Sequence, residues 1–323
     1  MSWDEILKSA QRVEARNGVD YREVSCGRVL NRVDSREVSY LRSVNPYLNC
    51  EVGCTYCFAR DVAGRRGDAT EFSTSVYVKT ESPRVFRQEL ARLAARGQIS
   101  QPIGLGTATD PYQPVEKRQR LTRALLEELA RHEGVVVSVY TQSDLVLRDL
   151  DLLQEINRHG HARVNVTLTT PCRNLARSLE PRAPTPELRL KAVQRLARAG
   201  VPVGVMCMPI IPEVTDSPRD LRSLVCDAQA AGASWFSSRV LFLRNESRQS
   251  FMGWLSKERP GLVAYFRRMY AKSNNAPEHV RDRIERVVSA LRRQHGVCAE
   301  VPFPAIAGKG RQLPLFGPAV GAA

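Results

Sequence analysis

Three of the chain's eight cysteines, Cys50, Cys54 and Cys57, lie within a stretch of eight residues. Thiolates bind soft metals and iron–sulfur clusters. Three of them this close together can surround one inorganic core only if the backbone between them curls tightly, and Gly53 permits such a curl. The spacing therefore indicates an inorganic centre held by a single short loop.

Zinc is the first alternative for this centre. A structural zinc site usually takes four nitrogen or sulfur ligands, commonly as two close pairs. The five histidines show no paired ligand spacing, and the remaining cysteines stand alone at positions 26, 172, 207, 226 and 298. Three ligands without a fourth favour a cluster in which one iron is left open.

The same three cysteines also match one face of a helix, because their offsets are four and seven residues. In that case they would be buried core residues, which free cysteine often is. Asn45-Pro46, Asn49 and Gly53 are instead typical of a loop. We therefore expect a loop, with a core helix as the alternative.

The pattern Cys-x-x-x-Cys-x-Tyr-Cys, with Tyr56 before the last cysteine, follows an apolar strand and resembles the signature of the radical S-adenosylmethionine (radical SAM) enzymes. The resemblance implies that Cys50, Cys54 and Cys57 hold a [4Fe-4S] cluster, that its open iron binds SAM, and that Tyr56 belongs to the cofactor site. It also implies a 5′-deoxyadenosyl radical that abstracts hydrogen from an unactivated C–H bond, and a reductant such as flavodoxin or ferredoxin. In such an enzyme the protein supplies geometry and excludes water.

Composition places the chain among globular proteins. Its 323 residues are 43% hydrophobic, enough for one large domain or two small ones. Lys and Arg total 48 against 34 Asp and Glu, and the net charge of +14 favours a polyanionic partner such as nucleic acid. Because 41 of the 48 cations are arginines, an arginine-biased genome is the alternative source of this excess.

We expect a cytoplasmic protein with reduced thiols. The amino terminus lacks the charged and apolar regions of a secretion signal. The longest mostly apolar run, residues 201–211, contains Pro202, Gly204 and Pro209 and is shorter than the roughly 20 residues that span a bilayer. No membrane association is expected.

Apolar β-branched runs alternate with amphipathic helical patterns between residues 37 and 244. Such alternation predicts a parallel sheet with crossover helices. The expected strands are 37–44, 103–105, 135–140, 164–168, 203–208 and 235–243, and the expected helices are 84–96, 118–131, 147–157, 186–199 and 217–231. Six units predict an α/β fold, a partial (β/α)6 TIM-type barrel.

Three further segments complete the expected organisation. Residues 1–36 form an amino-terminal extension with a short helix at 3–13, residues 245–300 a basic helical extension, and residues 301–323 a flexible tail. The charged, glycine-containing stretch from Asp61 to Asp68 is expected to be exposed.

In such barrels the chemistry lies at the carboxyl ends of the strands. Gly104 and Gly106 either let the backbone approach a ligand closely or belong to an ordinary turn. Asn165 and Thr167 either bind a ribose or only face a neighbouring strand. The candidates for cofactor binding are, together with Tyr56, residues Gly104, Gly106, Thr107, Gln142, Ser143, Asn165 and Thr167.

Residues 50–60, 106–116, 145–153 and 179–190 together are similar to the spore photoproduct lyase-related branch of the superfamily. This resemblance implies a repair-type reaction on DNA. Modification of RNA, a peptide or a small metabolite is the alternative, and a non-catalytic iron–sulfur protein associated with DNA is a third.

The chain departs from that branch at two positions. In the lyase a cysteine after the second strand returns a hydrogen atom to the substrate, whereas this chain has Thr107 at that position. Lyase chemistry would therefore need another hydrogen donor, and Cys172 and Cys207 are the candidates. The alternative is that both are plain core thiols. Most relatives also have a lysine after the third strand. This chain has Gln142, which can form a hydrogen bond but carries no charge.

Residues 257–297 contain ten Lys and Arg against four Asp and Glu, with Trp254, Tyr265, Phe266 and Tyr270 in the same region. Such residues suit a bound single strand or extruded bases. A helix pair that packs its aromatic side chains inward is the alternative.

In the tail, Gln312-Leu313-Pro314-Leu315-Phe316 resembles the peptides by which bacterial DNA polymerases and repair proteins bind the sliding clamp. Leu315 and Phe316 would enter an apolar pocket and Gln312 would form a hydrogen bond. The alternative is that the peptide folds back onto the barrel.

Overall fold

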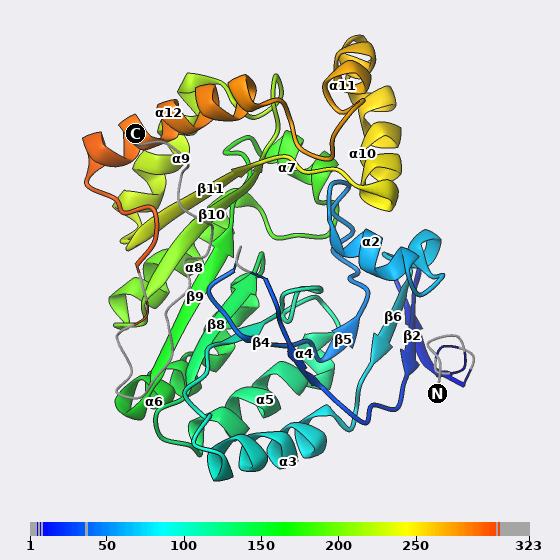
Figure 1. Cartoon of the computed structure of the whole chain (residues 1–323), viewed down its shortest axis with the longest axis vertical. Helices are drawn as coiled ribbons and strands as arrows, with labels where there is room; N and C mark the ends of the chain where they lie inside the picture. Colours follow the sequence, from blue (N-terminus) through cyan, green and yellow to red (C-terminus); the bar gives the residue numbers. More distant parts are fainter. Residues whose placement is uncertain (1–4, 6, 8, 36–37, 302, 304–323) are drawn as a thin grey trace.

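The computed structural model describes residues 5, 7, 9–35, 38–301 and 303 (Figure 1). Within these residues the main sheet has seven strands in the order β11-β10-β9-β8-β7-β4-β3. All neighbours are parallel except β3 and β4. The strands are β3 Leu30–Arg32, β4 Arg42–Val44, β7 Ile103–Leu105, β8 Val136–Thr141, β9 His161–Thr167, β10 Val203–Ile210 and β11 Trp235–Val240. The predicted α/β fold, a partial (β/α)6 barrel of six parallel strands, is confirmed.

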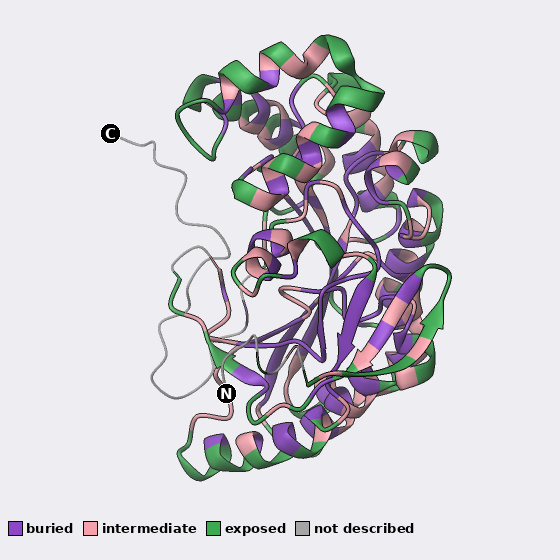
Figure 2. Cartoon of the chain, turned by 90° about the vertical axis from the view of Figure 1, so that its right-hand side faces the viewer, coloured by how far each residue is buried: buried purple, intermediate pink, exposed green. Residues whose placement is uncertain are grey.

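Helices between the strands cover the sheet, and Figure 2 shows the buried strands enclosed by helices with exposed outer faces. Strand residues such as Val137, Val166 and Val205 are fully buried, as expected for parallel strands covered on both faces. The crossover helices are α3 Ser82–Ala95, α4 Glu116–Gln119, α5 Leu121–Ala130, α6 Leu150–His159, α7 Arg173–Leu179, α8 Pro186–Arg198 and α9 Pro218–Ala230. The helix predicted over 118–131 is interrupted at Arg120, which has a left-handed backbone with φ 52°.

The helix predicted over residues 3–13 is wrong from Gln11 onward. Residues Gln11–Arg16 form β1, which pairs antiparallel with β2, Val19–Glu23. Asn17 and Gly18 between them both have positive φ, 52° and 74°, the geometry that joins two strands in a tight hairpin. With β5 (Tyr47–Leu48) and β6 (Ser75–Val78), they form a second sheet in the order β1-β2-β6-β5.

The expectation that the stretch from Asp61 to Asp68 is exposed holds at Arg65 and Gly67 but is wrong for the two aspartates. Both aspartates are buried, and Asp61 lies in helix α2, Ala59–Gly64. Asp61 accepts hydrogen bonds from the backbone N–H of Glu246 at 2.8 Å and from the Ser247 hydroxyl at 2.7 Å. Asp68 accepts one from the Asn49 amide at 2.9 Å. Buried carboxylates are tolerated because such donors satisfy them.

The carboxyl-terminal extension consists of α10 Asn245–Glu258, α11 Val263–Met269 and α12 Glu278–His295. Phe251, Trp254, Phe266 and Tyr270 are buried, and the Phe251 and Phe266 ring centroids lie 5.3 Å apart. The aromatic residues therefore pack inward, and Trp254, Phe266 and Tyr270 do not form an exposed platform for bases. No helix in the described ranges is long and apolar enough to cross a bilayer.

After α12 the chain crosses the amino-terminal ends of the strands. The backbone N–H of Phe236 donates to the Cys298 carbonyl at 2.8 Å. Arg163 donates to the Val301 carbonyl at 2.6 Å, and its guanidinium lies 3.8 Å from the centroid of the Phe303 ring. These contacts fasten Cys298, Val301 and Phe303 to the barrel. The predicted clamp-binding residues 312–316 lie outside the described residues.

Candidate active site

The cysteine loop follows β4 and β5, at the carboxyl end of the first parallel strand. Cys50 and Cys54 are buried, and Cys57 is partly exposed. Gly53 has a left-handed backbone with φ 75°, so the tight curl predicted from the sequence is present. Helices α2, α7 and α10 gather at the same end of the sheet (Figure 1).

The loop environment is unfavourable for free thiolates. Burial raises the pKa of all three thiols, and the negative charges of Asp110 beside Cys50 and of Glu180 beside Cys54 raise it further. Thiolates here need a positively charged partner, which a metal centre supplies.

Two N–H groups point at the sulfur atoms. The backbone N–H of Asp110 donates to Cys50 Sγ at 3.4 Å, and Gln142 Nε2 donates to Cys54 Sγ at 3.1 Å. Hydrogen bonds of this kind orient and tune the thiolates of iron–sulfur clusters. In the described part of the chain, no three His, Cys, Asp or Glu side chains lie close enough together to bind a single metal ion. In an iron–sulfur cluster each cysteine binds a different iron, so the three thiols can lie further apart. The loop therefore fits a cluster.

The loop after β7 is built around Asp110, which is buried. Its carboxylate accepts hydrogen bonds from the Thr141 hydroxyl and the Gln142 backbone N–H, both at 2.7 Å, and from the Tyr112 backbone N–H at 2.9 Å. Burial raises the pKa of this carboxyl group. Asp110 therefore ties the ends of β7 and β8 to the cysteine loop.

The two glycines of this loop allow tight packing within the chain. A Cβ at Gly104 would lie 2.8 Å from Thr107 Cγ2 and 2.9 Å from the Tyr40 ring. At Gly106, where φ is 84°, it would lie 2.3 Å from the Pro111 ring. The space beside each glycine is thus filled by the protein itself.

Three of the predicted polar residues lie near the cluster loop. Thr107 accepts a hydrogen bond from the Asn45 amide at 3.3 Å. The Ser143 hydroxyl caps the following turn by accepting the Leu145 N–H at 3.2 Å. Gln142 contacts Cys54, and its Oε1 is buried without a hydrogen-bond partner. Gln142 therefore has an acceptor available for a ligand.

Asn165 faces its neighbours in the sheet, and the ribose role considered for it is wrong. Its side chain is fully buried and donates to Ser138 Oγ at 3.1 Å and to the Val139 carbonyl at 3.2 Å. Its Oδ1 accepts from Trp235 Nε1 at 3.1 Å. Thr167 lies two residues further on the same face and remains partly exposed.

The two thiols considered as hydrogen donors differ in access. Cys172 is exposed and directly precedes α7. Cys207 is fully buried, and burial raises its pKa to about 12. Gly204 is paired with Asn165 and therefore lies on the same face of the sheet. Cys207 lies three residues after Gly204, so its side chain points to the face opposite to that of Asn165. Cys207 is therefore a core thiol, and the expectation that it faces a substrate is wrong.

A buried ion pair supports the cysteine loop, and the sequence reasoning did not predict it. Glu180 accepts hydrogen bonds from the Tyr56 hydroxyl, from Thr169 Oγ1 at 2.7 Å and from Arg189 Nη2 at 2.5 Å. Glu180 and Arg189 are both 1% exposed. Glu180 lies beside Cys54 and holds the hydroxyl of Tyr56, the residue before Cys57.

Backbone contacts strengthen the same attachment. The Thr55 N–H donates to the Leu179 carbonyl at 2.9 Å, and the Arg182 N–H donates to the Val52 carbonyl at 3.2 Å. Arg182 Nη1 also donates to the Glu51 carbonyl at 3.0 Å. We call residues 179–189 the clasp, because they hold the cysteine loop from the carboxyl end of β9.

A parallel partial barrel whose first strand leads into a loop with two buried thiols and a third that is partly buried fits an iron–sulfur enzyme. The model of the radical SAM superfamily matches residues 44–225, and the chain belongs to this superfamily. Its members use a [4Fe-4S] cluster and SAM, so the predicted cofactors and the predicted class of enzyme are confirmed.

Relatives extend over most of the chain. Uncharacterised proteins of Mycobacterium bovis and Mycobacterium tuberculosis are 34% identical over 278 residues, which cover 85% of this chain and 81% of theirs. A protein of Methanocaldococcus jannaschii is 31% identical over 54% of this chain and 61% of its own.

Among solved structures, a mutant of spore photoproduct lyase with bound AdoMet and dinucleoside spore photoproduct has a TM-score of 0.62. It is 16% identical and the match covers 81% of this chain and 76% of that chain. The lyase complexed with dinucleoside spore photoproduct has a TM-score of 0.60 with the same coverage. At this identity the likeness concerns the fold.

Proposed function

We propose that this radical SAM enzyme acts on DNA in a repair-type reaction. The observation that carries the proposal is the fold shared over 81% of the chain with spore photoproduct lyase, whose structures hold a dinucleoside photoproduct. The net charge of +14 supports a polyanionic substrate. When bound, the cluster and SAM supply a 5′-deoxyadenosyl radical that removes hydrogen from a C–H bond.

In this proposal Cys50, Cys54 and Cys57 hold the cluster. The Asp110 backbone and the Gln142 amide donate hydrogen bonds to two of the thiolates. The remaining acceptor of Gln142, Oε1, would be available to the amino group of bound SAM, which is a suitable donor. Tyr56 acts through Glu180 to fix the loop that carries the ligands.

The hydrogen donor distinguishes a lyase-type reaction from other outcomes. Thr107 is not a suitable donor, and of the two thiols considered only Cys172 is accessible. A lyase-type reaction therefore predicts that Cys172→Ser slows turnover or diverts the product. Cys298→Ser, which changes another exposed thiol, is the matched control. Normal turnover by both variants would refute Cys172 as the donor.

The absence of a cysteine at position 107 also supports a second candidate, modification of RNA, a peptide or a small metabolite. Equilibrium binding to matched DNA and RNA oligonucleotides separates these substrates. A DNA enzyme binds DNA more tightly, and log K falls linearly with log salt because phosphate contacts release counterions. Equal or absent binding to DNA would contradict the proposal.

We also propose that Gln312, Leu313, Leu315 and Phe316 bind a bacterial sliding clamp. Cys298 and Val301, which precede this peptide in the chain, are fastened to the amino-terminal ends of the strands, away from the cysteine loop. A clamp partner would thus be tethered from the far end of the barrel. Leu315→Ala with Phe316→Ala should abolish clamp binding and leave the melting temperature and iron content unchanged. A lowered melting temperature without clamp binding by the wild type would instead indicate that the peptide folds back onto the barrel.

A further inference from the structure

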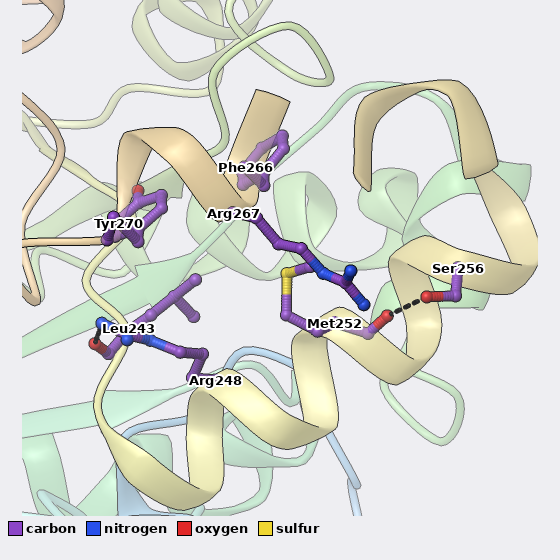
Figure 3. A pocket seen from close by; sticks show the side chains of 8 residues that line it. Leu243, Arg248, Met252, Ser256, Phe266, Arg267 and Tyr270 are labelled. Carbon is purple, nitrogen blue, oxygen red and sulfur yellow. Dashed lines mark hydrogen bonds between the residues drawn. The ribbon is translucent and has the colours of Figure 1, made fainter. Parts of the chain in front are cut away.

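A pocket of 260 Å³ lies between α10 and α11, beside the end of the last parallel strand (Figure 3). Its walls combine apolar and aromatic side chains with two guanidinium groups. The lining residues are Leu243, Arg248, Met252, Ser256, Phe266, Arg267, Tyr270 and Ala271. The pocket lies outside residues 44–225, the part of the chain that the superfamily model matches.

The pocket is positively charged and its charges are poorly satisfied. Arg248 and Arg267 both line it, and none of the lining residues is acidic. Arg248 Nε is buried without a hydrogen-bond partner, and Nη2 donates to three neutral acceptors: the Ser273 carbonyl at 3.2 Å, and the Leu243 carbonyl and Asn274 Oδ1 at 3.4 Å. Arg267 forms no ion pair or hydrogen bond through its side chain within the described residues.

A bound anion would resolve both features. A buried N–H without an acceptor is destabilising because it has lost its hydrogen bond to water, and two like charges on one pocket repel each other. Guanidinium groups match the oxygen atoms of phosphate, and charge-assisted hydrogen bonds of this kind are among the strongest in proteins. Met252 supplies an apolar wall against which a sugar can pack.

The pocket is held at the same end of the barrel as the cysteine loop. Helix α10 carries Arg248 and Met252, and its Ser247 hydroxyl donates to Asp61 of α2 at 2.7 Å. Trp254 Nε1 of the same helix donates to Ser178 of α7 at 3.0 Å. Helix α2 begins two residues after Cys57. Helix α10 therefore links the pocket to the helices that flank the loop carrying the cluster ligands.

We propose that this pocket binds a backbone phosphate of the nucleic-acid substrate and sets where the strand enters the active site. The proposal rests on the proposed function, since it supplies a phosphate-binding site for the same substrate. A free phosphate ion has the same chemistry, so the test includes inorganic phosphate as well as DNA and RNA oligonucleotides.

The test uses the reconstituted full chain and compares Arg248→Gln, Arg267→Gln and the double variant with Arg195→Gln. Arg195 is exposed on α8, so its replacement makes the same change of charge away from the pocket. Fluorescence anisotropy with a labelled oligonucleotide gives K at several salt concentrations. The double variant should bind roughly tenfold more weakly, and the slope of log K against log salt should become less steep by about 1. Arg195→Gln should change neither quantity.

The outcomes separate the pocket from the proposed function. If the wild type binds DNA and the double variant binds with the affinity and slope of Arg195→Gln, the pocket proposal is overturned while the DNA proposal stands. If the wild type binds no nucleic acid, both are overturned. Millimolar inorganic phosphate should displace the oligonucleotide more readily from the wild type than from the double variant. Equal displacement from both proteins would also overturn the pocket proposal. Should Arg248→Gln fail to fold, the exposed Arg267→Glu carries the same comparison against Arg195→Glu.

Discussion

Replacing Tyr56 with phenylalanine removes the hydroxyl group that joins the cysteine loop to the clasp. That hydroxyl donates to the buried carboxylate of Glu180, which Arg189 and Thr169 also bind. A hydrogen bond to a charged group contributes about 1.5–3 kcal/mol. The Tyr56→Phe variant should therefore lose about that much stability. Glu180→Gln should lose more, about 3–5 kcal/mol, because it leaves the buried charge of Arg189 without its partner.

Thermal unfolding of the reconstituted protein, scanned anaerobically at one fixed rate, measures this loss. For domains of about 150–250 residues 1 kcal/mol corresponds to about 2–4 °C, so on that scale Tyr56→Phe should melt roughly 3–12 °C lower. The matched control is Tyr77→Phe, since Tyr77 is buried but its hydroxyl donates no hydrogen bond within the described chain. Because Tyr56 precedes Cys57, iron should also be lost faster to a chelator. Equal melting temperatures and equal iron loss for the two variants would refute the role of the clasp.

Three further predictions concern the loop and its surroundings. Alanine at any one of the three loop cysteines should remove the cluster, whereas Cys298→Ala should retain it; full iron and sulfide content in a loop variant would contradict the ligand assignment. Gln142→Leu should lower the reduction potential of the cluster by on the order of 40 mV. The variant loses about 1 kcal/mol of N–H···S stabilisation, which favours the reduced cluster with its added electron. An unchanged potential in a redox titration would exclude this contact. Burial lowers the pKa of Lys79 to about 8 in the folded protein. Between pH 8 and about 10 this lysine is therefore protonated more in the unfolded chain than in the folded one, and the free energy of unfolding rises with pH. Lys79→Met should remove that contribution, and unfolding curves with the same pH dependence for both proteins would contradict it.

The clearest strands of the main sheet could be predicted from sequence because they are short, buried runs rich in β-branched residues. Residues 135–140 illustrate this, since valines dominate a strand covered on both faces. The cysteine loop could be predicted because its chemistry is local. Cys50, Cys54 and Cys57 are close in the chain, and Gly53 has the positive φ that the curl requires.

The clasp could not be predicted in the same way, because its contacts join residues distant in sequence. Tyr56 and Glu180 are 124 positions apart, and nothing in either local sequence indicates the other. Asn165 was ambiguous for a related reason, since its partners lie on two other strands, at Ser138 and Trp235. The β1–β2 hairpin did have a local signal, Asn17-Gly18, which outweighs the helical spacing of the apolar residues before it.

Isotope transfer tests the proposed DNA substrate most directly. The reconstituted and reduced protein is incubated with unlabelled SAM and deuterated DNA, and the 5′-deoxyadenosine is analysed by mass spectrometry. A radical SAM enzyme that acts on DNA moves deuterium from the DNA into 5′-deoxyadenosine, and the Cys54→Ala variant forms none of this product. Formation of 5′-deoxyadenosine that contains no deuterium, at a rate that DNA does not change, would contradict DNA as the substrate.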